Sequence, residues 1–590
     1  MKIEKIQQCY EVTTNSIIVK IDCINFDIIV SIGSKIAYCG KVDVRLDSLE
    51  QCEFISDMEL DSISEQQDII KLLFIQKSNL WTEKKIVIEI REESISCYGM
   101  VKGNELAITD VTYYGNNQKK TDFKKYIVPR FDWSHGKVLK SAEENDILSC
   151  QQWLSPPPFC YILTDEVHYV PAFVCAEKGQ NNYVSMKYQG ESASFSLQFE
   201  GHQIVKESYQ TPRLVLGKSQ NNYEMALRYY KDFLVKERSI ITLPEKEIPK
   251  WWKEPIFCGW GEMRYEYRTE HDSHENGNFI NVTDYCTQKR YENYISVLEK
   301  NGIDPGIIII DMGWANEAAL SAPNPHKWED MRGFIDKEHK KGKHVLLWFT
   351  PVVTQGLPNE ACMMLHNRAV APDPTNPIYQ KILKQEIYKM LSEDEGCLNA
   401  DGFKIDFTQN TPSEEGIFRC YLNSFWGLIN ETNEKHLYSH RKERKELVSV
   451  YKENVWGMEL LKEYIFNIYV NMKKIKGDSL LITHTPNPYF AEVVDMLRLN
   501  DLDGESEGVL EIMKGRALLA NIGCDKWLID TDNDLMVDKK HWRDYLEMQL
   551  ELGIPDTYYA THIAASGEKF DEKEYLLLKN VFKRHREKIS

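Results

Sequence analysis

The sequence lacks several features that would each identify a class of protein. No stretch approaches the roughly 18 consecutive apolar residues of a membrane-spanning helix, and the start, "MKIEKIQQCYEV", has no apolar central run of a signal peptide. The 14 cysteines include no C-x-x-C pair, since the closest two, Cys150 and Cys160, are ten residues apart. We therefore expect no membrane span, no zinc ribbon, and reduced thiols in a cytoplasmic protein.

An excess of positive charge is also missing. The formal net charge is -18, whereas a nucleic-acid-binding protein presents a basic surface, so we expect no nucleic-acid partner. No repeat or low-complexity segment occurs. With 42% hydrophobic and 27% charged residues, the 590-residue chain has the composition of a globular protein and the length for two domains.

The first part of the chain has the alternation of β-strands. In "ESASFSLQFEG", Ala193, Phe195, Leu197 and Phe199 alternate with polar residues, which gives the period of two expected for a half-buried strand. "KKIVIEI", "NSIIVKI" and "FDIIVSI" behave in the same way. These short strands predict an N-terminal antiparallel β-sandwich over residues 1–243, followed by a linker in the Pro-flanked stretch "LPEKEIPKWW".

Strands and helices alternate in the remaining residues, 244–590, apart from a helical insertion at about 418–476. Near-continuous apolar runs are typical of parallel strands that are buried on both faces. Eight such strands predict a (β/α)8 TIM barrel. The strand candidates are "PIFCGW", "GIIIIDMGW", "HVLLWF", "DGFKIDF", "SLLITH", "DMLRLND", "DKWLID" and "DTYYATH".

Polar residues gather where these strands end, which is where barrel enzymes place their catalytic groups. The ring is rich in carboxylates and contains no obvious Ser or Cys nucleophile. Paired carboxylates are what glycoside hydrolysis needs, one to attack the anomeric carbon or activate water and one to protonate the leaving oxygen. Lys404 would keep the neighbouring Asp406 ionised or bind a sugar hydroxyl. The strand-end residues are Asp311, Trp314, Trp348, Lys404, Asp406, His484, Arg498, Asp501, Asp530 and Asp532.

Four of these strand ends together resemble a known family. "ADGFKIDF" resembles the K-x-D motif on strand four of clan D α-glycosidases, the α-galactosidase-like glycoside hydrolase families 36 and 27. "IIIIDMGWA" resembles their "DDGW", "LLWFTP" their Trp-Phe strand three, and "MLRLND" their Arg-x-x-Asp strand six. The four stretches occur in the family's order, and a β-sandwich precedes the barrel in family 36.

The resemblance implies a retaining α-glycosidase without metal or other cofactor, acting on an oligosaccharide or glycoside. Asp406 would be the nucleophile and Asp501 the general acid/base, with Asp503 as the alternative proton donor. Six further strand-end residues would contact the sugar: Asp311, Trp314, Trp348, Lys404, Arg498 and His484. Met312 stands where the resembled motif has its second Asp, so the sugar and its linkage stay open.

Two alternatives use the same fold. A raffinose-synthase-like transglycosidase would use the same carboxylate pair but pass the sugar to an acceptor other than water. A carbohydrate-binding barrel without catalysis would bind sugars and turn none over. The assembly state, a homo-oligomer included, is also open.

The acidic run "DTDND" at 530–534 needs an interpretation of its own. It has carboxylates at alternate positions, as a calcium loop does, but Leu535 and His541 stand where such a loop needs Gly and Glu. We therefore predict an acidic turn that caps the helix after strand seven.

Overall fold

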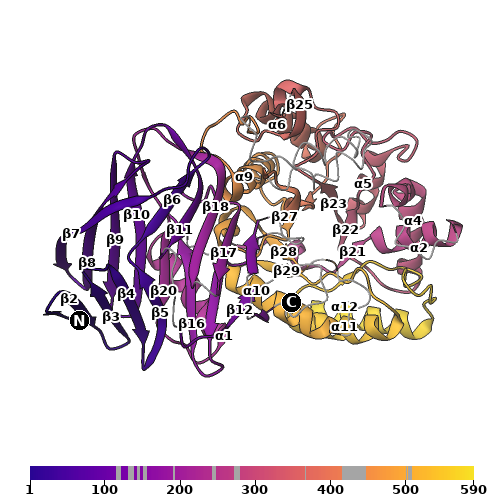
Figure 1. The fold of residues 1–590 in the computed structure, drawn as a ribbon. Coiled ribbons are helices and arrows are strands. Elements are labelled where there is room, and N and C mark those ends of the chain that lie inside the picture. The colour runs from indigo at the N-terminus through magenta and orange to yellow at the C-terminus, as the bar shows by residue number, and fades with distance from the viewer. Residues whose placement is uncertain are drawn as a thin grey trace.

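The computed structural model describes most of the chain, with a strand-rich N-terminal region beside a barrel ringed by helices (Figure 1). The described residues are 1–114, 121–129, 139–142, 146–150, 156–190, 193–241, 247–271, 279–365, 367–414, 447–499, 501 and 508–589. The predicted boundary between residues 243 and 244 and residues 418–446 of the predicted insertion lie outside them, as does Asp503.

The described part of residues 1–217 forms antiparallel sheets. Their strand orders are β1-β2-β3-β4-β5, β13-β12-β15-β16-β20-β10-β9-β8-β7 with β19 on β10, and β14-β17-β18-β11-β6. The strands are β1 (Lys2–Ile6), β2 (Cys9–Thr13), β3 (Ile17–Asp22), β4 (Asp27–Ile32), β5 (Lys35–Lys41), β6 (Val44–Ser48), β7 (Ile55–Gln66), β8 (Ile69–Ser78), β9 (Glu83–Arg91), β10 (Ser94–Lys102), β11 (Leu106–Tyr113), β12 (Lys125–Pro129), β13 (Leu139–Ala142), β14 (Asp146–Ser149), β15 (Cys160–Thr164), β16 (Tyr169–Cys175), β17 (Ser185–Gln189), β18 (Ser194–Val205), β19 (Ser208–Gln210) and β20 (Arg213–Gly217).

The alternating residues of these strands make the core of the predicted sandwich. In β18, Phe195, Leu197 and Phe199 are buried, and Leu197 lies opposite Val111 of β11. Two sheets meet at Gly99 of β10, where a Cβ would lie 3.2 Å from a methyl group of Val44 on β6. A side chain at residue 99 would have to push the sheets apart, so the close packing favours glycine. The β-sandwich prediction is confirmed.

All eight predicted barrel strands are present in the described residues, and each pairs in parallel with its neighbours. Because Asp530 bridges in parallel to Ile554, just before the last strand, the sheet closes on itself. The TIM-barrel prediction is confirmed. The strands are β21 (Ile256–Cys258), β22 (Ile307–Ile310), β23 (His344–Phe349), β26 (Gly402–Ile405), β27 (Leu480–Thr483), β28 (Met496–Arg498), β29 (Leu528–Asp530) and β30 (Asp556–Thr557).

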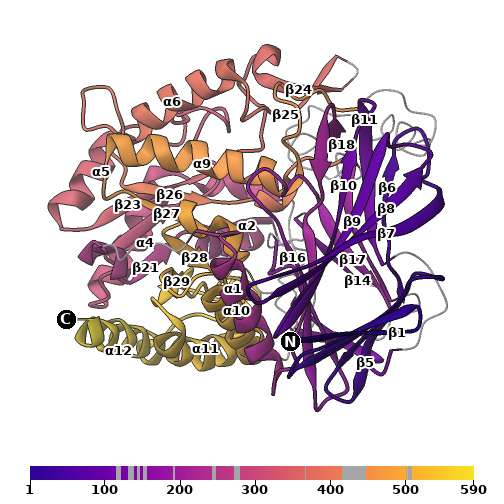
Figure 2. The same ribbon diagram turned by 90° about the vertical axis from the view of Figure 1, so that its left-hand side faces the viewer.

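Helices cover the outside of the barrel, and α6 and α9 run side by side over one part of it (Figure 2). Side-chain caps fix several helix starts; Thr287, Asp330, Asn376 and Asp538 each accept a hydrogen bond from a backbone N–H of the first turn. The helices are α1 (Tyr223–Lys236), α2 (Trp260–His271), α3 (Phe279–Val282), α4 (Gln288–Lys300), α5 (Met331–Lys340), α6 (Pro377–Leu391), α9 (Gly457–Ile475), α10 (Val509–Gly523), α11 (Lys539–Leu552) and α12 (Glu572–Ile589). Within the described ranges, no helix is long and apolar enough to cross a membrane.

The sandwich contacts segments that follow two neighbouring barrel strands. After β26, Oε1 of Glu414 lies 2.8 Å from Nε2 of His202 in the sandwich. Before α9, Trp456 donates from Nε1 to Glu200 at 3.0 Å. After β27, Asn487 donates to the carbonyl oxygen of Pro157 at 2.8 Å. The sandwich therefore supports the carboxyl-end side of the barrel, where the predicted site lies.

Candidate active site

Glycine starts the strand that carries the two central residues of the site. Gly402, the first residue of β26, has φ +152°, and a Cβ there would lie 2.0 Å from the carbonyl oxygen of Leu480 in β27. The close approach of two parallel strands requires a residue without a side chain. Lys404 and Asp406 then follow on alternate positions and lie at the carboxyl end of the strand.

Several donors surround the Asp406 carboxylate. Its Oδ2 accepts from Trp348 Nε1 at 3.1 Å, and its Oδ1 lies 3.2 Å from His484 Nε2 and 3.3 Å from Arg498 Nη2. The backbone N–H of Phe407 donates to Oδ1 at 2.9 Å. Four neighbouring groups therefore fix the orientation of this carboxylate.

Arg498, at the end of β28, joins the two predicted catalytic carboxyls. Its Nη2 contacts Asp406, while its Nη1 donates to Asp501 at 2.7 Å and to Asp532 at 2.8 Å. The Arg498 side chain is 1% exposed, whereas Asp406 and Asp501 are 19% and 24% exposed. Two partly exposed carboxyls thus contact one buried guanidinium.

Lys404 pairs with a different carboxylate from the predicted one. Its Nζ donates to Asp311 Oδ2 at 2.6 Å and to the Tyr558 hydroxyl at 3.2 Å, and no direct contact with Asp406 is present among the described atoms. Asp311 also accepts from the Cys258 thiol at 3.0 Å. Asp311 and Lys404 are therefore a buried ion pair beside the predicted catalytic carboxyls, and Lys404 acts on Asp406 through its electrostatic field.

The predicted aromatic and histidine residues also lie at this end of the barrel. Trp348 is 4% exposed and bonds Asp406, while the fully buried His484 lies on the other side of the same carboxylate. Trp314 donates from Nε1 to the carbonyl oxygen of Trp348 at 2.8 Å and is 2% exposed. Trp348 and His484 contact the predicted nucleophile, and Trp314 holds Trp348.

The surroundings move the pKa values of the two carboxyls apart. Burial alone would raise the pKa of Asp406, but Arg498 and His484, with help from Lys404, lower it well below its ordinary value. Burial raises the pKa of Asp501, and although Arg498 opposes this, Asp532 and Asp406 add to it. One carboxyl is held ionised and the other is favoured in its protonated form, which is the division of roles between a nucleophile and a proton donor.

The sequence analysis gave no role in the site to two residues, Tyr558 and Asp532, although it placed Asp532 among the strand-end residues. Asp532 contacts Arg498, and the Tyr558 hydroxyl donates to Asp532 at 3.3 Å. The predicted helix-capping role of the acidic run is wrong, because Asp538 caps α11, whereas Asp532 and Asp534 are fully buried. The available sequence signal for Asp532 was its position among alternating carboxylates directly after a barrel strand.

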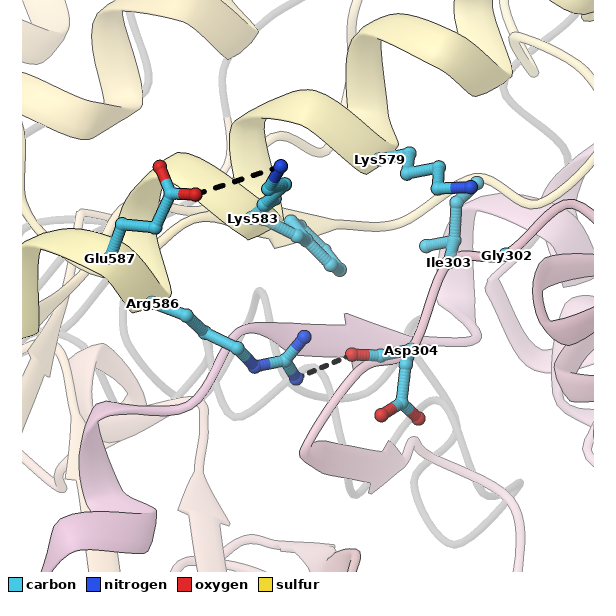
Figure 3. A pocket seen from close by; sticks show the side chains of 8 residues that line it. Gly302, Ile303, Asp304, Lys579, Lys583, Arg586 and Glu587 are labelled. Carbon is cyan, nitrogen blue, oxygen red and sulfur yellow. Dashed lines mark hydrogen bonds and ion pairs between the residues drawn. The ribbon is translucent and has the colours of Figure 1, made fainter. Parts of the chain in front are cut away.

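A second cavity lies away from the carboxylate pair. A groove of about 460 Å³ lies between α12 and the segment before β22, lined by residues such as Lys579, Lys583 and Arg586 (Figure 3). It lies at the opposite end of β22 from Asp311, so it is separate from the carboxylate pair. In the described part of the chain, no three His, Cys, Asp or Glu side chains are arranged to hold a metal ion.

Comparison with known families corrects the predicted resemblance. Residues 277–455 match the model described as "Glycosyl hydrolases family 31 TIM-barrel domain". This match covers about three tenths of the chain. The predicted likeness to families 36 and 27 is therefore wrong. The motifs that suggested it are two to four residues long and occupy strand ends that a retaining glycosidase must fill in any barrel, so they do not separate such families.

Several solved structures have a similar fold. The fold is similar to a family 31 sulfoquinovosidase from E. rectale in complex with an aza-sugar inhibitor, with a TM-score of 0.59, 11% identity and coverage of 99% of this chain and 83% of that one. It is also similar to an uncharacterized protein from Listeria monocytogenes EGD-e in complex with glucose, magnesium and calcium (TM-score 0.53, 11% identity, coverage 99% and 60%). A cycloalternan-forming enzyme from Listeria monocytogenes in complex with a pentasaccharide substrate has a TM-score of 0.50 at 12% identity, with coverage of 97% and 59%. At such identities the likeness shows the fold alone.

No curated protein matches the sequence. This chain spans about six tenths of the length of the two Listeria proteins. The general kind of the sequence prediction, a glycoside hydrolase on a TIM barrel, agrees with the family 31 match, whereas α-galactosidase-like specificity is not supported.

Proposed function

We propose that this protein is a retaining α-glycosidase that uses Asp406 as the nucleophile and Asp501 as the general acid/base. The observation that supports it most directly is the contact of both carboxyls with the single buried guanidinium of Arg498. Sugars or sugar-like inhibitors bound in structures of similar fold support an oligosaccharide or glycoside as the substrate. The sugar, the linkage and the predicted cytoplasmic location stay open.

The proposed reaction has two displacements. Asp406 attacks the anomeric carbon while Asp501 gives its proton to the departing glycosidic oxygen, so a glycosyl ester forms and the aglycone leaves as an alcohol. Asp501, now a carboxylate, removes a proton from water, and the hydroxide oxygen displaces Asp406 from the anomeric carbon. Each carboxyl returns to its starting form. Arg498 faces both carboxyls and offsets the negative charge that passes between them.

The arrangement around Asp406 suits this role. Oδ1 has three neighbouring donors, whereas Oδ2 has Trp348 alone among the described hydrogen bonds. Oδ2 therefore keeps the more available lone pair for attack on the sugar. Lowering the pKa of Asp406 keeps the attacking group ionised at neutral pH.

The test is turnover of a panel of nitrophenyl α-glycosides, with and without added sugar acceptors. We expect Asp406→Asn to reduce kcat/KM at least about 10³-fold, because the neutral amide cannot form the ester. Asp525→Asn is the matched control, since that side chain is 71% exposed and lies outside the site. Turnover that persists unchanged in Asp406→Asn contradicts the proposal, and sugar binding without turnover in the wild type favours the binding protein. Transfer to the acceptor instead of water identifies a transglycosidase.

A further inference from the structure

Asp532 occupies a position that the two-carboxylate mechanism does not use. It lies just after β29 with φ +42°, and its side chain is fully buried. Its Oδ2 accepts from Arg498 Nη1 at 2.8 Å, the same nitrogen that donates to Asp501 at 2.7 Å. The buried Asp532 carboxylate and the proposed proton donor therefore share one guanidinium nitrogen.

The local structure holds Asp532 in this position. Its backbone N–H donates to Asp530 at 3.0 Å, and its Oδ1 accepts from the backbone of Asp534 at 2.9 Å. The Tyr558 hydroxyl donates to its Oδ2 at 3.3 Å. Asp532 is thus buried, has a left-handed backbone conformation and is held by hydrogen bonds to residues before and after it. Such a conformation is costly for a non-glycine residue, so we interpret it as serving a function.

We propose, on the basis of the proposed glycosidase function, that Asp532 is a positioning residue that keeps the proton on Asp501 between catalytic steps. Its negative charge disfavours a second carboxylate nearby, and its share of Arg498 Nη1 weakens the support that Asp501 would receive when ionised. Both effects act in the same direction. Asp532 itself does not touch the reacting atoms.

Other charged groups around Asp501 must be weighed against this effect. Arg498 of β28 favours the ionised form, as Lys404 of β26 does, while Asp406 beyond β26 opposes it. Arg516 of α10 donates to the backbone carbonyl oxygen of Asp501 at 3.0 Å. Asp406 and Asp532 are the two carboxylates that oppose ionisation of Asp501. Asp406 cannot be replaced without losing the proposed nucleophile, so Asp532 is the one whose effect can be tested separately.

The experiment is the pH dependence of kcat/KM on a substrate with a poor leaving group, compared between the wild type and Asp532→Asn. Asn tolerates the left-handed conformation and keeps the shape of the side chain. We expect the fall of kcat/KM at high pH to move to lower pH by about one unit, because a neighbouring negative charge is lost. An unchanged high-pH limb contradicts the inference while leaving the proposed function intact.

A second substrate separates this effect from structural damage. A dinitrophenyl glycoside has a leaving group that needs no proton, so Asp532→Asn should retain its kcat/KM within about threefold. An equal loss on both substrates means that the variant has disturbed Asp406, and the inference then fails. Absence of turnover in the wild type contradicts the proposed function instead.

Asp534→Asn is the matched control, since this neighbouring carboxyl makes no contact with Arg498. Burial raises its pKa to about 7, so replacement changes little charge below neutral pH. We expect a smaller movement of the high-pH limb than in Asp532→Asn. If Asp532→Asn does not fold, Asp532→Ser removes the same charge and should move the limb in the same direction. An unmoved limb in Asp532→Ser contradicts the inference.

Discussion

The ion pair between Asp311 and Lys404 shows what single residues contribute to this barrel. Both side chains are almost completely buried and their charged atoms lie 2.6 Å apart. Removing one partner leaves the other charge unpaired away from water, which costs about 3–5 kcal/mol. We expect Lys404→Met to lower the free energy of unfolding by this amount in a urea titration followed by tryptophan fluorescence.

A surface ion pair is the control for Lys404→Met. Lys337 and Glu292 lie 3.3 Å apart with both side chains largely exposed, so Lys337→Met should cost no more than about 1 kcal/mol. Equal effects of the two substitutions would mean that burial does not govern the pair. The double variant Asp311→Asn/Lys404→Met should recover part of the loss, because no unpaired charge remains.

The proposed roles of Asp406 and Asp501 predict how catalysis depends on pH. Asp406 has a pKa well below its ordinary value, so it loses its charge only at very low pH. Asp501 has a raised pKa, and activity is lost as pH rises through that value and its proton leaves. We expect kcat/KM to be level on the acid side while the protein stays folded, and to fall on the alkaline side. Asp501→Asn should abolish the alkaline fall in the residual activity, and an alkaline fall that survives would assign the proton donor elsewhere.

Residues at strand ends could be predicted from the sequence, but their partners could not. Spacing predicts that Lys404 and Asp406 share one face at the end of a strand, and in the structure Lys404 lies in β26 and Asp406 directly follows it. The same spacing cannot show that Lys404 reaches across to Asp311, because that depends on the register of β22 against the other strands. The burial of Asp532 could not be predicted for a similar reason, since carboxylates at alternate positions after a strand occur in solvated turns as well as in buried ones.

At the scale of elements, a carboxylate on α2 holds the segment that follows the last barrel strand. Glu262 accepts from the backbone N–H groups of Ala560, Thr561 and His562 and from the Thr561 hydroxyl. Tyr558 of the active site lies at the start of this segment. We expect Glu262→Ala to lower the free energy of unfolding by about 3 kcal/mol, because buried N–H groups lose charged acceptors. Amide hydrogen exchange at residues 560–562 should become faster.

A second glutamate of the same helix is the control for Glu262→Ala. Glu270 is 56% exposed and its replacement by Ala should leave exchange at residues 560–562 unchanged. Faster exchange throughout the barrel in Glu262→Ala would mean general destabilisation and not loss of a local clamp.

The barrel strands were predicted from the sequence, whereas a short hairpin between them was not. Apolar runs identified the barrel strands because strands buried on both faces exclude polar residues. The hairpin of β24 (Cys362–Leu365) and β25 (Arg368–Pro372), in the loop after β23, was not predicted. Its strands are four and five residues long and their register shifts between Met363 and Met364, so no sustained alternation marks them.

At the scale of the whole molecule, buried carboxyls set how stability depends on pH. Asp534 is 1% exposed and its nearest cation, Arg264 Nη1, lies 3.6 Å away, beyond hydrogen-bond distance. Burial is the first cause that raises the pKa of Asp534 to about 7 and that of Asp530 to about 6. The folded protein therefore binds protons that the unfolded chain, with an aspartate pKa of 3.8, has already lost.

The sign of the effect follows from proton binding. Between pH 4 and pH 7 the folded state holds a proton on Asp534 and the unfolded state does not, so this residue's contribution to stability decreases as pH rises, by on the order of 1.4 kcal/mol per pH unit. Asn at this position binds no proton in either state. We expect Asp534→Asn to gain stability relative to the wild type as pH rises from 4 to 7 in urea titrations. The net charge of -18 destabilises the wild type and the variant almost alike, so their difference isolates Asp534. The exposed Asp525→Asn should show no such trend, and a difference between Asp534→Asn and the wild type that does not vary with pH would mean that Asp534 is ionised in the folded protein.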